Sequence, residues 1–479
     1  DPARGHLAHP RAPQVAPPDR VTDSGSLSFY RFVEESSNWE PITPAVLDPQ
    51  GEVVTATFTD APAIMAVLRR TTPGGSVVAY LPPNGTLHPD AVPHVTLVHT
   101  LDFTPQADGS LAGTLSKVEA AGSFEVYPVV FSNASTQGSV AIVESILSSP
   151  ASRTNHVQQL LARANEFNVK GLDIAYLDLP VTQRTSFTLF VGELYQALHS
   201  VNKQLTLTLP APTVTQSRVD EGAYDYAELA KTADLIQIAP YRDQGTYRLV
   251  MPEILRYLTE RMPSGKLVLT VSPYATETGG ETIRTMPIVE AMNIATRISI
   301  RAQTDAITTS TQIDVAGTNI DREENLTGVR WHPQSATVAF SYKQAQGGGS
   351  RTIYLENFFS IGFKLELVSS YRLGGVAIED ASANTYLGNI WTALTPFITS
   401  GQPILMRPNE ADLQPRWAAS GSGTIEALPG GAARWFTPAE PGTYTISLTL
   451  SDGVALFENN APVNVLPRDG GASSQSAGN

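Results

Sequence analysis

The sequence predicts an α/β fold: a (β/α)8 TIM barrel with a small α+β insertion, flanked by modules that resemble β-sandwiches. Two observations lead to this prediction. Short apolar runs alternate with amphipathic helical stretches from about residue 73 to residue 399, as expected of βα units around a parallel sheet. About eight such units suggest a closed barrel. Near the C-terminus, short strand-like runs separated by turn residues are typical of a sandwich.

Composition limits the classes of function. The chain has 479 residues, of which 42% are hydrophobic and 16% charged, enough for a barrel with accessory modules. Its net charge of -14 argues against a nucleic-acid partner, because phosphate binding needs a basic face. It contains no cysteine, which excludes disulfides and thiolate metal sites. No apolar run approaches the roughly 18 residues of a membrane span.

The N-terminal part predicts two short regions. Residues 1–24 are rich in proline without periodicity and predict a linker, or an arm that packs on a neighbouring subunit. Residues 25–72 predict a β-rich module, because Leu27–Val33 alternates between apolar and polar side chains. Since the sequence opens at Asp1 without methionine, we expect a processed end.

The barrel is predicted at residues 73–399, with an insertion at about 275–350 that holds a helix near 287–299. Helices are expected at 140–147, 155–168, 186–201 and 251–261, and residues 391–397 are expected to close the barrel. The predicted strands are 77–81, 94–101, 124–131, the start of 168–180, 204–210, 234–241, 266–274 and the end of 351–378.

The remaining residues predict a sandwich and a tail. Residues 400–467 contain Trp417, Trp435 and the run Pro441-Gly-Thr-Tyr, and resemble bacterial immunoglobulin-like or PKD-like modules. Residues 468–479 are rich in glycine and serine and predict a flexible tail.

The most specific pattern is Asn168-Val-Lys-Gly-Leu-Asp-Ile-Ala-Tyr-Leu-Asp-Leu-Pro180. It resembles the fourth-strand signature of glycoside hydrolase family 18, the chitinase-like barrels, which reads D-G-x-D-x-D-x-E and ends on the catalytic glutamate. If Gly171 is the motif glycine, Asp173 stands at the second aspartate, Ala175 at the third and Leu177 at the glutamate. The stretch 351–378 resembles the last helix and eighth strand of spore-type and cell-wall-type members.

The resemblance implies a substrate-assisted hydrolysis in which the glutamate donates a proton and the preceding aspartate orients the substrate acetamide. Residues i and i+2 of a strand share a face, so Asp173, Ala175 and Leu177 should all point into the barrel mouth. Neither alanine nor leucine can do this chemistry, and general acid catalysis supplies about 10²–10⁴ in rate. We therefore expect an apolar plug at Leu177 and no catalysis.

Two carboxylates leave alternatives open. Asp178 lies one residue beyond the glutamate position, and by parity faces the helices unless a bulge near Tyr176 turns it inward. Asp173 is either a catalytic group or a buried carboxylate hydrogen-bonded to its barrel neighbours.

Two further family positions differ in this chain. The sixth strand of the family ends in Met-x-Tyr-Asp, whereas here Tyr241 is followed by Arg242 and then Asp243. The eighth strand of the family ends in a tryptophan that floors the sugar site, and here Glu379 stands there. Glu379 could form an ion-pair cluster with Arg242 and Asp173, or an acid pair for a different hydrolysis.

These patterns predict an exported, non-catalytic protein that binds cell-wall or surface glycan or builds a surface assembly, with no cofactor. The alternative is a glycosidase acting on an N-acetylglucosamine polymer.

His94 and His99 lack a metal-ligand spacing, so no metal site is predicted. Protein partners or self-association would use the N-terminal arm and the sandwich modules, and the location would be extracellular or the cell surface. Possible glycosylation sequons are Asn84, Asn133 and Asn325. The candidate catalytic residues, if the protein is active, are Asp173, Asp178 and Glu379. The candidate substrate-binding residues are Tyr80, Tyr176, Tyr241, Arg242, Asp243 and Glu379.

Overall fold

The computed structural model divides the chain into two units, Asp1–Pro73 and Gly74–Asn479. The residues described are 27–33, 38–44, 46–47, 54–56, 62–69 and 75–468, apart from 121, 216–217, 281, 303–305, 318–327, 344–348 and 384. The predicted arm at 1–24, most of the predicted tail and the sequon at Asn325 lie outside these residues.

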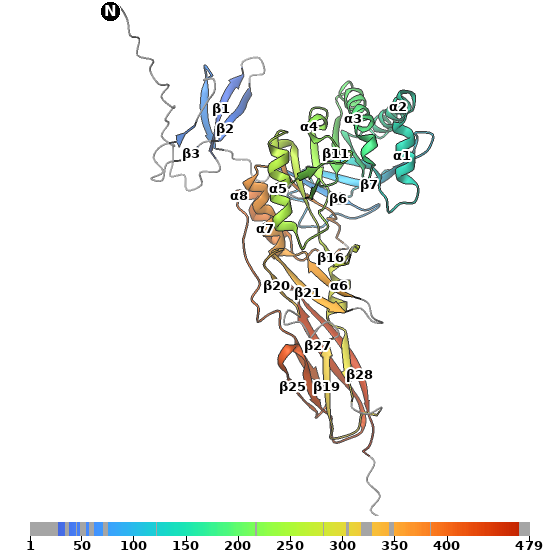
Figure 1. Ribbon diagram of the computed structural model, residues 1–479, viewed down its shortest axis with the longest axis vertical. Helices are drawn as coiled ribbons and strands as arrows, with labels where there is room; N and C mark the ends of the chain where they lie inside the picture. The colour runs from blue at the N-terminus through green and yellow to red at the C-terminus, as the bar shows by residue number, and fades with distance from the viewer. Residues whose placement is uncertain are drawn as a thin grey trace, which may run out of the picture. The chain divides into compact units, whose positions relative to one another are not determined.

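Eight parallel strands of the second unit close into a barrel, as the sequence predicted (Figure 1). Each strand pairs with the next in chain order, and the first, β6, pairs with both the last, β23, and the second, β7. The strands read as nearly continuous apolar runs because both of their faces are buried. The barrel strands are β6 (Ser76–Leu81), β7 (Leu97–Pro105), β9 (Glu125–Ser132), β10 (Gly171–Tyr176), β11 (Gln204–Leu209), β14 (Leu235–Ile238), β15 (Leu267–Val271) and β23 (Gly375–Ile378). A short strand β8 (Leu111–Gly113) forms a hairpin with the end of β7.

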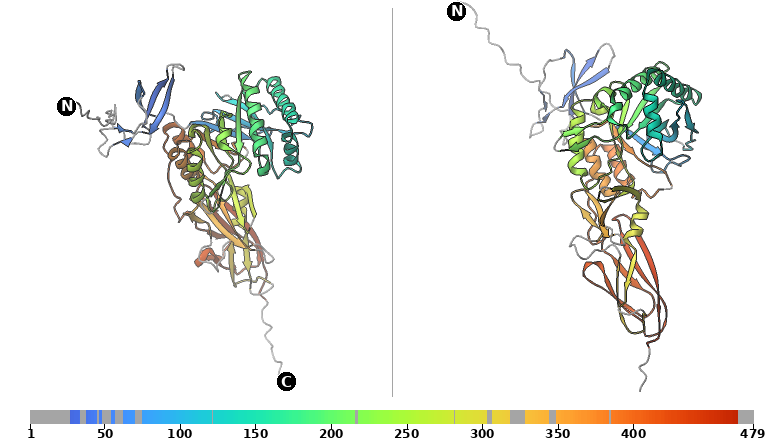
Figure 2. Two further views of the ribbon diagram at one scale, coloured as in Figure 1. Left: turned by 45° about the horizontal axis from the view of Figure 1, so that its top comes forward. Right: turned by 45° about the vertical axis from the view of Figure 1, so that its right-hand side comes forward.

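Helices surround these strands, and Figures 1 and 2 show α1 to α5 on the outside of the sheet. Ser149 caps α2 by accepting a hydrogen bond from the Ser152 amide, and Pro150 occupies the first helical position, where its missing N–H costs nothing. Asn357 and Ser360 form a capping box at the start of α7. The helices are α1 (Ser139–Leu147), α2 (Pro150–Glu166), α3 (Arg184–His199), α4 (Tyr226–Leu229), α5 (Tyr247–Thr259), α7 (Phe358–Ser370) and α8 (Trp391–Ser400).

Strand β10 shows how the sequence determines which side chains face inward. Leu172, Ile174 and Tyr176 belong to the large apolar core that the strands share with the helices. Ala175 belongs instead to the smaller cluster inside the barrel. Position 171 accepts only glycine without a shift of its neighbours, because an added Cβ would lie 2.5 Å from the ring of Tyr127. The motif glycine is therefore explained by packing alone.

An α+β insertion follows the seventh strand, as predicted. Its five-stranded sheet has the order β17-β16-β22-β21-β20, and one helix, α6 (Ile288–Ala295), packs against it. The insertion extends beyond the predicted limit of residue 350, because residues 350–355 form a strand of this sheet and not part of the last barrel helix. The strands are β16 (Tyr274–Gly279), β17 (Thr282–Pro287), β20 (Arg330–His332), β21 (Thr337–Lys343) and β22 (Ser350–Leu355).

The C-terminal strands form two sheets, and one sheet is completed by the insertion. The hairpin of β18 (Ile298–Arg301) and β19 (Gln312–Gly317) joins β26 (Ala433–Phe436) and β25 (Thr424–Ala427) in the order β18-β19-β26-β25. The facing sheet contains β24 (Arg416–Ala419), β27 (Gly442–Ser451) and β28 (Leu456–Val465). Figures 1 and 2 show β27 and β28 alongside β19.

This arrangement corrects the expectation that residues 400–467 form a module by themselves. Ile313 and Val315 of β19 are buried in one apolar cluster with Trp435, Ile446 and Val463. Without the inserted hairpin, β26 would lose a neighbouring strand and Trp435 would lose part of its packing. Two segments more than a hundred residues apart in sequence therefore share one core.

The turn between β27 and β28 ties the C-terminal strands to the barrel. Asp452 is wholly buried, and its Oδ1 accepts hydrogen bonds from the amides of Val454 and Ala455 at 2.8 Å each. The Asn357 side chain at the start of α7 donates to the Asp452 carbonyl at 2.8 Å, and Tyr386 donates to its Oδ2 at 3.2 Å. Burial raises the pKa of Asp452, so this contact is formed at some cost in desolvation.

The first unit contains a small antiparallel sheet of order β2-β1-β5. Its central strand β1 (Leu27–Val33) matches the predicted alternating run, and Phe29 on it is fully buried. The other strands are β2 (Asn38–Pro44) and β5 (Met65–Arg69), with a short pair β3 (Val46–Leu47) and β4 (Val54–Thr55) beside them in sequence.

Candidate functional site

The carboxyl ends of barrel strands are where (β/α)8 proteins place their functional residues. In this chain these ends carry two kinds of side chain. Leu101 in the middle of β7, Phe131 near the end of β9 and Leu177 just after β10 are all partly exposed apolar side chains. The ends of β14, β15 and β23 carry polar and charged groups. The mouth of the barrel therefore has an apolar side and a polar side.

Asp173 lies inside the barrel below the mouth. Its side chain is fully buried, and both oxygens accept hydrogen bonds at 2.7 Å, from Thr206 to Oδ1 and from Thr208 to Oδ2. Thr208 is also hydrogen-bonded to the Tyr80 hydroxyl at 2.5 Å. Tyr80, a candidate for substrate binding, is thus 6% exposed and belongs to this internal network. Of the two interpretations left open for Asp173, the geometry matches the buried, hydrogen-bonded carboxylate.

His99 lies beside Asp173 inside the barrel but does not pair with it as a cation. Its Nδ1 lies 3.8 Å from Asp173 Oδ1 and has no hydrogen-bond partner among the described residues. The ring meets the edge of Tyr80 at 4.9 Å between centroids and stacks on Tyr127 at 6.1 Å. Burial lowers the pKa of His99, although Asp173 opposes this effect, so the ring is neutral at neutral pH.

Leu177 stands directly above Ala175 and Asp173 on the inward face. Its amide donates to the Ser132 carbonyl at 2.7 Å, which continues the pairing of β10 with β9 by one residue. Because the alternation of the strand is maintained up to this bond, Leu177 faces the barrel axis like Asp173 and Ala175. An apolar side chain therefore stands at the inward position that follows β10.

Asp178 leaves the strand immediately afterwards. Its backbone has φ 62°, a left-handed conformation, and its side chain is exposed. Oδ2 accepts a hydrogen bond from the Ala134 amide at 2.9 Å, in the loop that follows β9. Asp178 thus fixes a neighbouring loop, and no bulge turns it toward Asp173.

Tyr176 does not line the mouth, and its prediction as a substrate-binding residue is corrected. It is fully buried in the helix layer, where it stacks on Phe190 at 5.8 Å. Its hydroxyl is 2.6 Å from His156 Nε2, and His156 Nδ1 is 2.6 Å from the Gly109 carbonyl. A carbonyl only accepts, so Nδ1 donates to it. Burial lowers the pKa of His156, so the ring is neutral and Nε2 accepts from the Tyr176 hydroxyl. The parity of β10 requires this outward position for Tyr176.

We expect stability to fall with acidification because of His156. Burial lowers its pKa below the ordinary value of 6.5, so below that pH the unfolded chain binds a proton that the folded chain excludes. The free energy of unfolding should be constant above about pH 6.5 and decrease below it, by up to about 1.4 kcal/mol per pH unit for this group. Urea midpoints at pH 7.5 and 5.0 measure the effect. His156→Gln should reduce the decrease, and an equal decrease in this variant would contradict the assignment.

The polar side of the mouth is organised by Arg242 and Glu379. The guanidinium makes two hydrogen bonds to the carboxylate, at 3.0 Å from Nη1 to Oε2 and 2.5 Å from Nη2 to Oε1. Ser272 donates to Oε2 at 2.5 Å. The structure thus joins Arg242 to Glu379 as one sequence interpretation suggested, but Asp173 belongs to the separate internal network.

The other predicted residues near β14 stabilise the loop itself. Asp243 accepts a hydrogen bond from Thr246 at 2.8 Å, and the Tyr241 hydroxyl is 3.3 Å from the same threonine oxygen. Both residues are partly buried. Tyr241 is therefore positioned beside Arg242 by its own turn, and burial raises the pKa of its hydroxyl.

Sequence reasoning did not identify the residues contributed by the end of β15. Ser272 binds Glu379, and the Tyr274 hydroxyl donates to Asp380 Oδ2 at 2.5 Å. Thr385 also donates to this carboxylate oxygen, at 3.0 Å. The spacing of Ser272 and Tyr274, two residues apart at the end of the predicted strand 266–274, could have indicated them, because such residues continue the inward alternation.

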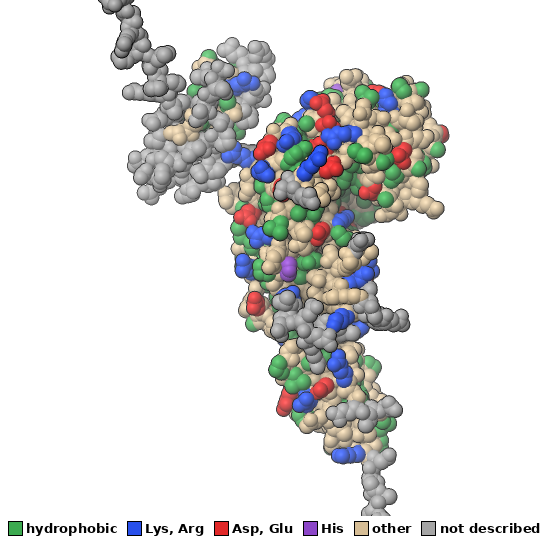
Figure 3. Space-filling view, viewed as in Figure 1, with side chains coloured by type: hydrophobic (Ala, Val, Ile, Leu, Met, Phe, Trp, Pro, Cys, Tyr) green, Lys and Arg blue, Asp and Glu red, His purple; other side chains and the backbone are tan. Residues whose placement is uncertain are grey.

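The described residues contain no group of three or more His, Asp or Glu that could hold a metal ion. On the face seen in Figure 3, acidic and basic side chains are interspersed over the barrel and do not form a patch of one sign. None of the helices within the described part of the chain is both long and apolar enough to cross a bilayer.

Comparisons with known proteins agree with this geometry. The model of the family described as glycosyl hydrolases family 18 matches residues 138–383, just over half of the chain. The uncharacterized glycosylase YvbX of Bacillus subtilis is 18% identical over 242 residues, which are 49% of this chain and 63% of that protein. The chain thus spans less than two thirds of this relative's length.

Two solved structures share the fold. A chitinase from Chromobacterium violaceum has a TM-score of 0.50 at 17% identity, with 67% of this chain and 98% of that chain covered. The spore cortex-lytic enzyme SleL of Bacillus megaterium has a TM-score of 0.50 at 16% identity, with 71% and 78% covered. The match over residues 138–383, which includes β10 and the end of β23, places the chain in a family: it belongs to glycosyl hydrolase family 18.

Proposed function

We propose that this chain is a non-catalytic member of family 18 that binds an N-acetylglucosamine-containing glycan of the cell wall or cell surface, or serves as a component of a surface assembly. One observation carries the proposal: the inward position at the end of β10 is occupied by Leu177. The carboxylate below it, Asp173, is enclosed, with both oxygens accepting hydrogen bonds. A proton donor must reach the glycosidic oxygen directly or through one water, which an enclosed carboxylate does not.

The amphipathic mouth supports binding. A sugar ring has an apolar face and a rim of hydroxyls, and the apolar side chains of Leu101, Phe131 and Leu177 lie opposite the polar group of Arg242 and Glu379. The hydrogen bonds between Arg242 and Glu379 fix the orientation of both side chains, so that they can form hydrogen bonds with sugar hydroxyl groups. An extracellular or cell-surface location follows from this class of ligand.

The alternative is an active hydrolase that uses Glu379 as its acid. It is favoured by the partial exposure of Glu379, whose side chain is 20% accessible at the mouth. It is opposed by the contacts of this carboxylate, since both oxygens accept from Arg242 and Oε2 also accepts from Ser272. Such contacts suit a group that positions Arg242 more than one that donates a proton.

Incubation of the full chain with chitooligosaccharides and with peptidoglycan tests the proposal. We expect no released product by mass spectrometry, and saturable binding of at least one of these glycans by calorimetry. Arg242→Ala should weaken that binding about tenfold, because it removes a charged hydrogen-bonding group at the mouth. The matched control is Arg261→Ala, a change of the same kind at an exposed site on α5's C-terminal side.

Product release would contradict the proposal if Glu379→Gln or Asp178→Asn abolished it, because one of these groups would then be the acid. Release that is lost only in Asp173→Asn would make Asp173 the acid, and release that survives all three substitutions would come from a contaminating enzyme. If no glycan bound, the glycan-binding role would be refuted and only the role in a surface assembly would remain. The oligomeric state of the same sample, measured by size-exclusion chromatography with light scattering, tests that role.

A further inference from the structure

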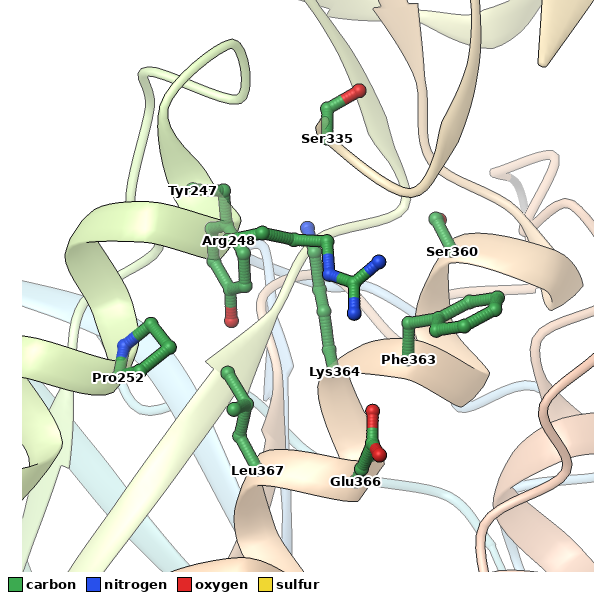
Figure 4. Close-up of a pocket in the computed structure, with 9 residues that line it drawn as sticks. All are labelled: Tyr247, Arg248, Pro252, Ser335, Ser360, Phe363, Lys364, Glu366 and Leu367. Atoms are coloured by element: carbon green, nitrogen blue, oxygen red, sulfur yellow. The ribbon is translucent and has the colours of Figure 1, made fainter. Parts of the chain in front are cut away.

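A second hollow lies outside the barrel mouth, between two neighbouring barrel helices. It has a volume of ≈ 80 Å³, or ≈ 380 Å³ when its opening to solvent is included. The first turns of α5 form one wall, the middle of α7 forms the other, and Ser335 of the insertion lies above them (Figure 4). This volume accommodates a group of a few heavy atoms.

The hollow contains a buried polar group that nothing satisfies. Tyr247 is 3% exposed, and its hydroxyl has no hydrogen-bond partner among the described residues. Figure 4 shows this hydroxyl pointing toward the gap between Pro252 and Leu367. Burial raises the pKa of Tyr247, so the hydroxyl keeps its proton and can donate it to an acceptor. A buried donor without an acceptor is costly, which points to a ligand group at this place.

A backbone acceptor belongs to the residue that follows Tyr247 on α5. Pro252 stands inside α5 and has no N–H, so the Arg248 carbonyl loses the donor that it would have in a regular helix. In such a helix the proline ring lies against the carbonyl four residues earlier, and here that ring lines the hollow. The hollow thus contains a hydroxyl that needs an acceptor, and beside it the Arg248 carbonyl lacks the donor of a regular helix.

Apolar and charged groups complete the hollow. Pro252, Leu367 and Phe363 supply apolar surface. At the rim, the Arg248 guanidinium lies over the Phe363 ring, 5.4 Å from its centroid, and Glu366 lies below it in Figure 4. Neither Arg248 nor Glu366 has an ion pair in the described residues, so both can exchange hydrogen bonds with a ligand.

We propose that this hollow binds the acetamido group of an N-acetylated sugar. The acetamide carbonyl accepts from Tyr247, its N–H donates to the Arg248 carbonyl, and its methyl group packs on Leu367 and Pro252. The sugar ring stays at the rim, where Arg248 and Glu366 reach its hydroxyls. Lys364 contributes only its stem, because its ammonium is held by Glu356 at 2.5 Å and Gln244 at 2.9 Å.

This site is separate from the barrel mouth, so it stands whether the mouth binds glycan, cleaves it or does neither. The two can be observed in the same sample, because Leu367 lines the hollow and Leu177 lines the mouth. In the full chain with methyl-labelled leucine, a ligand in the hollow shifts the NMR signal of Leu367, and a ligand in the mouth shifts that of Leu177.

Titration with N-acetylglucosamine should shift the Leu367 methyl signals in a saturable way, whereas glucosamine, which lacks the acetamide, should not. Tyr247→Phe should weaken this binding about fivefold, the loss of one neutral hydrogen bond, with no loss of stability because the hydroxyl has no partner in the free protein. Leu367→Phe should fill the hollow and abolish binding, as followed by calorimetry. The control is Tyr257→Phe, the same change on the same helix at a residue that does not line the hollow.

Three results would overturn the proposal: no shift at Leu367, equal shifts with glucosamine, or unchanged affinity in Tyr247→Phe. Titration with N-acetylalanine methylamide, which carries the amide without a sugar ring, tests whether the hollow prefers the amide of a sugar or that of a peptide. Binding of this compound as tight as that of N-acetylglucosamine would contradict the role of Arg248 and Glu366 in holding sugar hydroxyls. A shift at Leu177 alone would support the mouth and refute the hollow.

Discussion

Replacing Trp435 by alanine is expected to lower the free energy of unfolding of the C-terminal strands by about 3–5 kcal/mol, as deletion of a buried aromatic side chain usually does. Trp435 is fully buried, and on β26 it pairs directly with Ile313 of β19. The loss should therefore also loosen the hairpin of β18 and β19, which lies in the insertion of the barrel. Amide hydrogen exchange should become faster in residues 298–301 and 312–317 as well as in the C-terminal strands.

A neighbouring residue on the same strand provides the control. Arg434 pairs with Asp314 across the same two strands, at 3.1 Å, but both side chains are about 40% exposed. Arg434→Ala should change the free energy of unfolding by no more than about 1 kcal/mol, because exposed ion pairs contribute little. If Trp435→Ala accelerated exchange only after residue 400, the C-terminal strands would fold without the hairpin and the shared core would be refuted.

Asp173→Ala is expected to lower the stability of the barrel by about 3 kcal/mol. The change leaves the hydroxyls of Thr206 and Thr208 without their acceptor inside the barrel, and each buried unsatisfied donor costs about 1–3 kcal/mol. It also leaves a small cavity next to His99. Urea denaturation followed by circular dichroism measures the loss, and Asp173→Asn, which can still accept hydrogen bonds, should lose less.

The same substitution at Asp178, the exposed carboxylate that follows β10, gives the comparison. Asp178→Ala removes one surface hydrogen bond to the Ala134 amide and places alanine at φ 62°, so it should cost about 1 kcal/mol, well below the loss at Asp173. If Asp173→Ala were as stable as the unchanged protein and differed only in glycan turnover, Asp173 would be a catalytic group. The internal network would then not be its main role.

Local patterns in the sequence predicted the elements that depend on near neighbours. The alternation in Gly171–Tyr176 was sufficient to orient Asp173, Ala175 and Leu177 toward the barrel axis, because side chains of a strand alternate wherever its pairing is regular. The same rule required Tyr176 to face the helices, so its candidacy as a substrate-binding residue could have been rejected from the sequence. The order of strands and helices likewise predicted the closed barrel.

Contacts between distant segments could not be predicted in this way. Ser272 and Glu379 meet because β15 and β23 are adjacent in the closed barrel, and Trp435 meets Ile313 because β26 is paired with a strand of the insertion. The unpaired hydroxyl of Tyr247 is also visible only once α5 and α7 are packed together. The sequence by itself determined which residue types stand at the strand ends, including the leucine that follows β10. The tertiary structure alone decided which of them meet, because hydrogen bonds and packing depend on proximity in space and not along the chain.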